Sequence, residues 1–116
     1  MPDVTSKDCD WEISPQDVAR MRREGDDFVL IDCRTPEEHE TARIDGAMLV
    51  PMQELSVRIG ELRRYEDRLL VIFCHKGKRA MSVTAVLREL GFENVRSMAG
   101  GIHRWSEEID PAVPKY

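Results

Sequence analysis

Short apolar runs alternate with amphipathic segments along most of the chain. The runs at residues 28–31 and 69–73 are continuous, which is typical of strands buried on both faces of a parallel sheet. A helical repeat follows the second run. Its apolar stripe consists of Val83, Val86, Leu87 and Leu90. Because strands and helices alternate, the pattern predicts an α/β fold with a mainly parallel sheet.

Turn and capping signals give the boundaries of these elements. Ser14 followed by Pro15 indicates a helix start, and Thr35-Pro36-Glu37-Glu38 has the form of a capping box. Strands are expected at 11–13, 28–31, 69–73 and 94–97, with a further short strand within 44–51. Helices are expected at 15–25, from 36 onward, and at 53–64, 79–90 and 102–109.

The chain has 116 residues, the size of one domain. Neither an internal repeat nor a linker divides it. Residues 1–10 are polar and lack periodicity, so we expect a flexible lead-in there. Residues 11–116 are expected to form a single domain.

The charge pattern limits the kinds of ligand that the protein is expected to bind. The net charge is −5 and the pI is near 5.2, which argues against a nucleic-acid partner because phosphate binding needs a basic surface. The residues His75, Lys76, Lys78 and Arg79 nevertheless form a local cationic cluster. Such a cluster suits a small anion.

The chain has three cysteines and no apolar leader in its first residues, so we expect reduced thiols and a cytoplasmic protein. No run approaches the length of a transmembrane helix, which predicts no membrane partner. No CxxC, HExxH or calcium-loop pattern occurs, so a metal site is not expected. Without a coiled-coil repeat, we expect a monomer.

Cys74 is the candidate nucleophile. It lies at the carboxyl end of a predicted strand, the edge where ligands bind in open α/β sheets. A helix start, a turn at Gly77 and the neighbouring cations would all stabilise its thiolate. The alternative is a buried cysteine that only packs, but the strand-end position and the surrounding cations favour a reactive thiol.

These residues resemble the rhodanese family over nearly the whole chain. The motifs that carry the resemblance are Cys74-His75-Lys76-Gly77-Lys78-Arg79, Asp32-Cys33-Arg34-Thr35-Pro36-Glu37-Glu38-His39, Ala42-Arg43-Ile44-Asp45-Gly46-Ala47, Gly91-Phe92-Glu93-Asn94-Val95 and Met98-Ala99-Gly100-Gly101-Ile102-His103-Arg104-Trp105. The resemblance implies a five-stranded, mainly parallel sheet with helices on both faces.

The resemblance also implies a reaction. Cys74 would take sulfur from thiosulfate or a persulfide donor and pass it, as a persulfide, to a thiol, cyanide or a protein acceptor. No cofactor is implied. The substrate-binding residues would be His75, Lys76, Gly77, Lys78 and Arg79. The tail from Ile109 to Tyr116 resembles rhodanese domains fused to enzymes that activate sulfur carriers, a hint at a protein acceptor.

Two other functions remain open. Phosphatases and arsenate reductases related to rhodaneses have a loop one residue longer, whereas the loop from Cys74 to Arg79 has six residues, which favours sulfur transfer. A non-catalytic binding module is the other alternative, although such modules usually lose the cysteine. Ala80 stands where the family often has Ser, and Ala42 and Arg43 replace the usual Gly and His.

Three charged residues that follow the first long strand are expected to support the site. The resemblance and the capping box suggest that Asp32, Arg34 and Glu38 clamp the loop structurally. Cys33 lies at the same sheet edge as Cys74 and would either pack or form an internal disulfide, of which packing is favoured.

The three histidines and Cys9 are not expected to take part in the reaction directly. His75 is expected at the loop rim instead of acting as a general base. His39 and His103 are assigned to packing or to the surface, and Cys9 to an exposed position in the lead-in.

Overall fold

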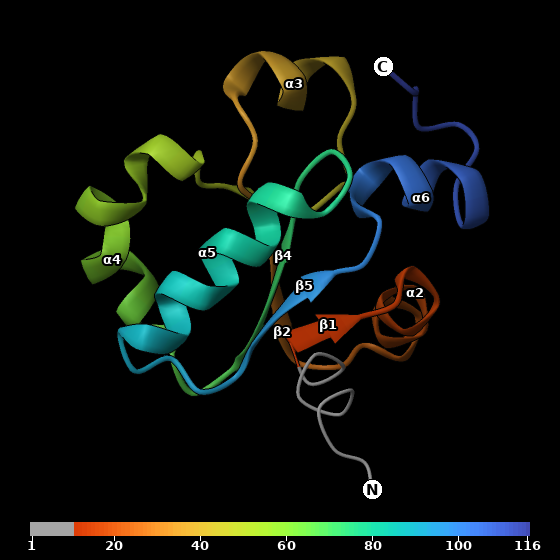
Figure 1. Ribbon diagram of the computed structural model, residues 1–116. Helices are drawn as coiled ribbons and strands as arrows, with labels where there is room; N and C mark the ends of the chain where they lie inside the picture. The colour runs from red at the N-terminus through yellow and green to blue at the C-terminus, as the bar shows by residue number, and fades with distance from the viewer. Residues whose placement is uncertain (1–10) are drawn as a thin grey trace, which may run out of the picture.

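A sheet of five parallel strands forms the centre of the molecule (Figure 1). The computed structural model describes residues 11–116, so the expected lead-in at 1–10, which includes Cys9, lies outside the described residues. The strands, in spatial order, are β1 (Glu12–Ile13), β5 (Val95–Met98), β4 (Leu69–Phe73), β2 (Phe28–Asp32) and β3 (Met48–Leu49). The predicted α/β fold is confirmed.

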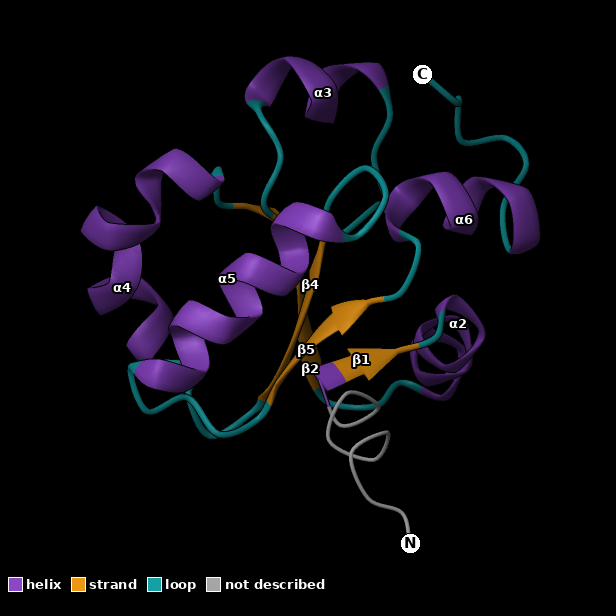
Figure 2. Ribbon diagram, viewed as in Figure 1, coloured by secondary structure: helices purple, strands orange, loops and turns teal. Residues whose placement is uncertain are grey.

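Helices cover both faces of this sheet (Figure 2). The helices are α2 (Pro15–Glu24), α3 (Pro36–Thr41), the 3-10 turn η1 (Met52–Glu54), α4 (Leu55–Arg63), α5 (Lys78–Glu89) and α6 (Gly101–Glu108). Helices α2 and α6 lie on one face, α4 and α5 lie on the other, and α3 lies beyond the carboxyl ends of the strands. None of the helices within residues 11–116 is long and apolar enough to cross a membrane.

The sheet separates two apolar clusters because side chains alternate between its faces. Leu30, Val71 and Phe73 pack against α2 and α6. Ile31 and Ile72 pack on the other face, against α4 and α5. The strands are therefore buried on both sides, as their uninterrupted apolar sequences predict.

The apolar stripe predicted for residues 79–90 is only half buried. Val83 and Leu87 are buried against the sheet, whereas Val86 and Leu90 are 43% and 42% exposed. These two side chains line a shallow apolar groove with Met52, Leu55 and Ile59 of η1 and α4. Periodicity alone marked all four positions as apolar but could not show that α4 leaves part of α5 uncovered.

Helices α2 and α3 begin differently from α5 and α6. The hydroxyl of Ser14 accepts a hydrogen bond from Asp17 N at the start of α2, and Thr35 forms the predicted capping box with Glu38 at the start of α3. Helices α5 and α6 instead start after Gly77 and Gly100, which have φ of 112° and 74°. Among the described residues, no side chain caps α5 or α6.

Candidate functional site

The carboxyl ends of β2 and β4 bring two segments of the chain together. Asp32 and Phe73 are partners in the last register pair between these strands. The segment that follows β2 leads into α3, and the segment that follows β4 is the loop from Cys74 to Arg79. We call residues 74–79 the nucleophile loop. The predicted site residues therefore gather at one edge of the sheet.

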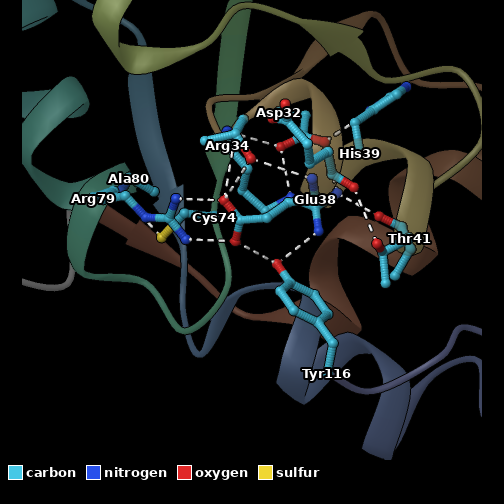
Figure 3. Close-up of polar contacts among 12 residues, drawn as sticks. Asp32, Arg34, Glu38, His39, Thr41, Cys74, Arg79, Ala80 and Tyr116 are labelled. Atoms are coloured by element: carbon cyan, nitrogen blue, oxygen red, sulfur yellow. Dashed lines mark hydrogen bonds and ion pairs between the residues drawn. The ribbon is translucent and has the colours of Figure 1, made fainter.

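The nucleophile loop wraps around the sulfur of Cys74. The backbone N–H groups of Gly77 and Ala80 point at this sulfur, at N···Sγ distances of 3.1 and 3.3 Å. Figure 3 shows Cys74 and Ala80 at this end of the site. The Cys74 residue is only 1% exposed. Main-chain amides at the start of α5 thus bind the sulfur, which is the arrangement expected to stabilise a thiolate or a sulfur-bound anion.

The start of α6 holds the same loop from its carbonyl side. Ile102 N donates to Cys74 O at 2.9 Å, and His103 N donates to His75 O at 3.0 Å. A Cβ atom at Gly101 would overlap both carbonyl oxygens, and Gly101 has φ of 62°. Only glycine therefore lets α6 approach the loop so closely.

The environment lowers the pKa of Cys74 to about 5. The largest cause is the interaction with the Cys33 thiol, which keeps its own proton; burial opposes it, and the amides of Ala80 and Gly77 and the charge of Arg79 add to it. The lowered pKa favours the thiolate form of Cys74 at neutral pH, and the thiolate is the form in which a cysteine acts as a nucleophile.

A network of charged and polar side chains lines the site on the α3 side, and we call it the polar wall. It consists of Asp32, Arg34, Glu38, His39 and Tyr116 (Figure 3). Arg34 is fully buried and donates to both carboxylate oxygens of Asp32, at 2.8 and 2.7 Å. Burial by itself would lower the pKa of Arg34, but the bonds to Asp32 and Tyr116 leave it raised.

Glu38 connects the polar wall to the nucleophile loop. Its two oxygens accept from Nη1 and Nη2 of Arg79, at 2.7 and 2.9 Å. This ion pair, with smaller contributions from Tyr116 and the Thr35 amide, holds the pKa of Glu38 well below its usual value. The Arg79 guanidinium is therefore fixed at the edge of the loop, and its pKa is raised by the same partner.

Tyr116 was not singled out by sequence reasoning, yet it closes the polar wall. Its hydroxyl accepts from Arg34 Nη1 and donates to Glu38, both at 2.8 Å. Its ring stacks on His75, with ring centroids 4.1 Å apart. The resemblance of the tail to fused rhodanese domains was the signal that pointed to this segment, although not to its contacts.

The histidines differ in their environments. His39 was assigned to packing or to the surface, but its Nδ1 lies 2.9 Å from Asp32 Oδ2 and so belongs to the polar wall. His75 lies between Tyr116 and His103 at the loop rim, and burial lowers its pKa. Its Nε2 has no hydrogen-bond partner among the described residues.

The loop lysines and Cys33 complete the set of predicted residues. Lys76 and Lys78 are exposed, and neither forms an ion pair with a described residue. Cys33 is buried in the same apolar cluster as Cys74. No group of metal-binding side chains occurs in residues 11–116. The geometry brings together a buried thiolate, main-chain donors and cations, which suits nucleophilic attack on a small anion.

Comparisons with known proteins agree with this geometry. A family model described as the rhodanese-like domain matches residues 14–108. A sulfurtransferase of Allochromatium vinosum is 31% identical over 102 residues, which are 88% of this chain and 94% of that protein. The human single-domain sulfurtransferase TSTD1 superimposes with a TM-score of 0.73 at 29% identity, over 84% of this chain and 96% of that structure.

A longer protein resembles this chain at nearly the same sequence identity. The probable adenylyltransferase/sulfurtransferase MoeZ of Mycobacterium tuberculosis is 30% identical over 104 residues. These residues are 90% of this chain, and the chain spans only 26% of the length of that relative.

Proposed function

Because the chain belongs to the rhodanese-like domain family, we propose that it is a sulfurtransferase that carries sulfane sulfur on Cys74 as a persulfide. One observation carries the proposal: the Cys74 sulfur lies in a six-residue loop and receives the N–H groups of Gly77 and Ala80. These donors favour the thiolate that attacks and would also favour an anionic persulfide.

The reaction is a double displacement. The Cys74 thiolate attacks the outer sulfur of a donor such as thiosulfate, the S–S bond breaks, and sulfite leaves with the bonding electrons. An acceptor thiol or cyanide then attacks the outer sulfur of the persulfide, and the Cys74 thiolate leaves. A low thiol pKa assists both steps, because Cys74 is charged before the first and is a good leaving group in the second.

The cations of the nucleophile loop would act on the anionic donor. Lys76 and Lys78 are exposed and would attract it electrostatically. Arg79, held by Glu38, would contribute its charge at the loop edge. The gathering of His75, Lys76, Gly77, Lys78 and Arg79 around Cys74 supports their proposed role in donor binding. Asp32, Arg34 and Glu38 would act through position, since they fix α3 and Arg79.

Location and partners belong to the same proposal. We propose a monomer that works in the cytoplasm as one domain spanning residues 11–116. The donor would be thiosulfate or another small persulfide donor. The names of relatives such as MoeZ, in which a sulfurtransferase is joined to an adenylyltransferase, support a protein acceptor for the sulfur.

The test is transfer chemistry on the intact protein. After treatment with thiosulfate, the wild type is expected to gain about 32 Da, reversibly by reductant, and to form thiocyanate from cyanide. Cys74→Ser should do neither, whereas the matched control Cys9→Ser should do both. Failure of the wild type to gain sulfur from any sulfane donor would overturn the proposal. Turnover of an aryl phosphate or arsenate would replace it with the related enzyme classes.

A further inference from the structure

A second thiol lies beside the nucleophile. Asp32 and Phe73 are register partners of the parallel strands β2 and β4, and Cys33 and Cys74 are the next residue on each chain. Cys33 N still donates to Phe73 O at 3.0 Å, so the two chains remain paired at this step. Neighbouring chains in a sheet are about 5 Å apart, which lies inside the Cα separation that a disulfide spans.

The two cysteine side chains point to the same face of the sheet. Partners at one register step of a parallel pair share a face, and both Cys33 and Cys74 belong to the apolar cluster beneath α4 and α5. Each is 1% exposed. Solvent therefore does not separate the two sulfur atoms, and each cysteine shifts the pKa of the other.

The groups around the Cys74 sulfur come from different elements. The amides of Gly77 and Ala80 belong to the nucleophile loop and α5, whereas Cys33 follows β2. Cys33 keeps its proton because the charged Cys74 and burial both raise its pKa. The free protein thus places two buried cysteines at neighbouring positions of paired strands, which is the arrangement from which a disulfide can form.

We propose that Cys33 is a resolving cysteine, which attacks the Cys74 persulfide to form a Cys33–Cys74 disulfide and releases the outer sulfur as hydrogen sulfide. This inference rests on the proposed function, since it begins from the persulfide. The Cys33 sulfur bonds to Cys74 Sγ, the S–S bond of the persulfide breaks, and the outer sulfur leaves with the bonding electrons. The proton of Cys33 goes to that leaving sulfur, which is reduced while the two cysteines are oxidised.

The step needs no external oxidant, because the sulfane sulfur accepts the electrons. Hydrosulfide is a competent leaving group, and it receives the Cys33 proton as the S–S bond of the persulfide breaks. A small thiol reductant would then reduce the disulfide by thiol–disulfide exchange and restore both cysteines. The protein would thereby release sulfide whenever an acceptor is absent.

The experiment follows the mass of the protein after sulfur loading. Wild type, Cys33→Ser and Cys9→Ser are treated with thiosulfate, separated from the donor and left without acceptor. The wild type and Cys9→Ser should pass from a gain of about 32 Da to a loss of about 2 Da while sulfide appears. Cys33→Ser should retain the gain and release sulfide at least about tenfold more slowly. Cys33→Ala is a second variant in case the buried hydroxyl impairs folding.

The outcomes separate the two proposals. If no variant gains sulfur, the persulfide function fails. If all gain it and the wild type holds it as long as Cys33→Ser does, the resolving role of Cys33 fails alone.

A second experiment, with peroxide, tests the proximity of Cys33 and Cys74 without a persulfide. Peroxide oxidises Cys74 to a sulfenic acid, which Cys33 should convert to the disulfide with loss of water. A peptide map should then join Cys33 to Cys74. Oxidation of the wild type to a sulfinic acid with no disulfide would overturn the inference.

Discussion

Helices α2 and α3 begin differently from helices α5 and α6. The first two starts contribute to stability, whereas the last two form part of the candidate site. Helices α2 and α3 are capped by their own Ser14 and Thr35 side chains. Helices α5 and α6 begin after glycines with positive φ, and no described side chain caps them. Their free amides bind the Cys74 sulfur and the carbonyl oxygens of Cys74 and His75 instead.

At α5 and α6 the missing cap coincides with contacts at the site, whereas α4, which also lacks a side-chain cap, continues directly from η1. The N–H groups of a helix start need partners, and a side chain in the cap position would occupy them. At α5 the partner is the sulfur of Cys74, the proposed nucleophile, and at α6 it is the backbone of the nucleophile loop. Changes at α5 and α6 should therefore alter sulfur chemistry, whereas changes at α2 should alter stability alone.

The largest effect is expected from Gly101→Ala at the start of α6. The new Cβ would overlap the carbonyl oxygens of Cys74 and His75, so the nucleophile loop must shift. We expect a loss of about 2–3 kcal/mol in the free energy of unfolding. The rate of sulfur loading should fall at least about tenfold. Denaturant unfolding and thiosulfate kinetics measure the two effects.

Gly25→Ala is the matched control for that variant. Gly25 also has positive φ, at 72°, but a Cβ there meets nothing within 4 Å. It should lose about 1 kcal/mol of stability through backbone strain and load sulfur normally. Equal loading rates for the two variants would contradict a role of α6 in holding the loop.

The next largest effect is expected on the pH dependence of the rate of sulfur loading in Cys33→Ala. With a Cys74 pKa of about 5, the wild-type rate should be constant above about pH 6 and fall as the pH drops through 5. Removing the Cys33 thiol takes away the largest contribution to this low pKa, so the fall should begin at a higher pH.

Cys33→Ser distinguishes the thiol donor from the packing of Cys33. Its hydroxyl can still donate to the Cys74 sulfur, so its pH profile should stay close to that of the wild type. Initial loading rates at several pH values, or the ultraviolet absorbance of the thiolate, give the midpoints. A wild-type midpoint in Cys33→Ala would show that Cys33 does not act on the thiolate.

A smaller effect is expected from Ser14→Ala at the start of α2. The variant loses the bond from Asp17 N to the Ser14 hydroxyl, which should cost about 1 kcal/mol of stability. Sulfur loading should be unchanged, because α2 contributes no group to the nucleophile loop. A loading defect in the folded variant would break the contrast between capped and uncapped helices.

The smallest effect is expected from Lys78→Ala in the first turn of α5. If main-chain amides bind the sulfur, this exposed side chain adds only long-range attraction for the anionic donor. The KM for thiosulfate should then rise about two- to threefold at low salt, and the difference should vanish at high salt. A salt-independent loss of kcat would instead place Lys78 in direct contact with the reacting atoms.

The sequence predicted the elements that depend on local pattern. The apolar runs marked β2 and β4, the capping signals marked α2 and α3, and Cys74 followed from its place at a strand end. These features depend on neighbours in the chain, so they are readable without the fold.

The contacts made across the fold were not predictable in the same way. Tyr116 reaches Arg34, 82 residues earlier in the sequence, and the amides of α6 reach the loop at Cys74. His39 bonds to Asp32 only because α3 turns back over the end of β2. The exposure of Val86 depends on how α4 packs, which periodicity does not encode.

The burial of Cys74 affects which of the two sulfur atoms of its persulfide an incoming thiol attacks. Its residue is 1% exposed, and a sulfur atom bonded to it lies about 2 Å farther along the side chain. A thiol that arrives from solvent would meet the outer sulfur, and attack there passes the sulfur on. Attack at the inner atom discards it as sulfide, and Cys33 lies beside that atom in the same apolar cluster. Burial thus assigns the two electrophilic atoms of one persulfide to two different thiols.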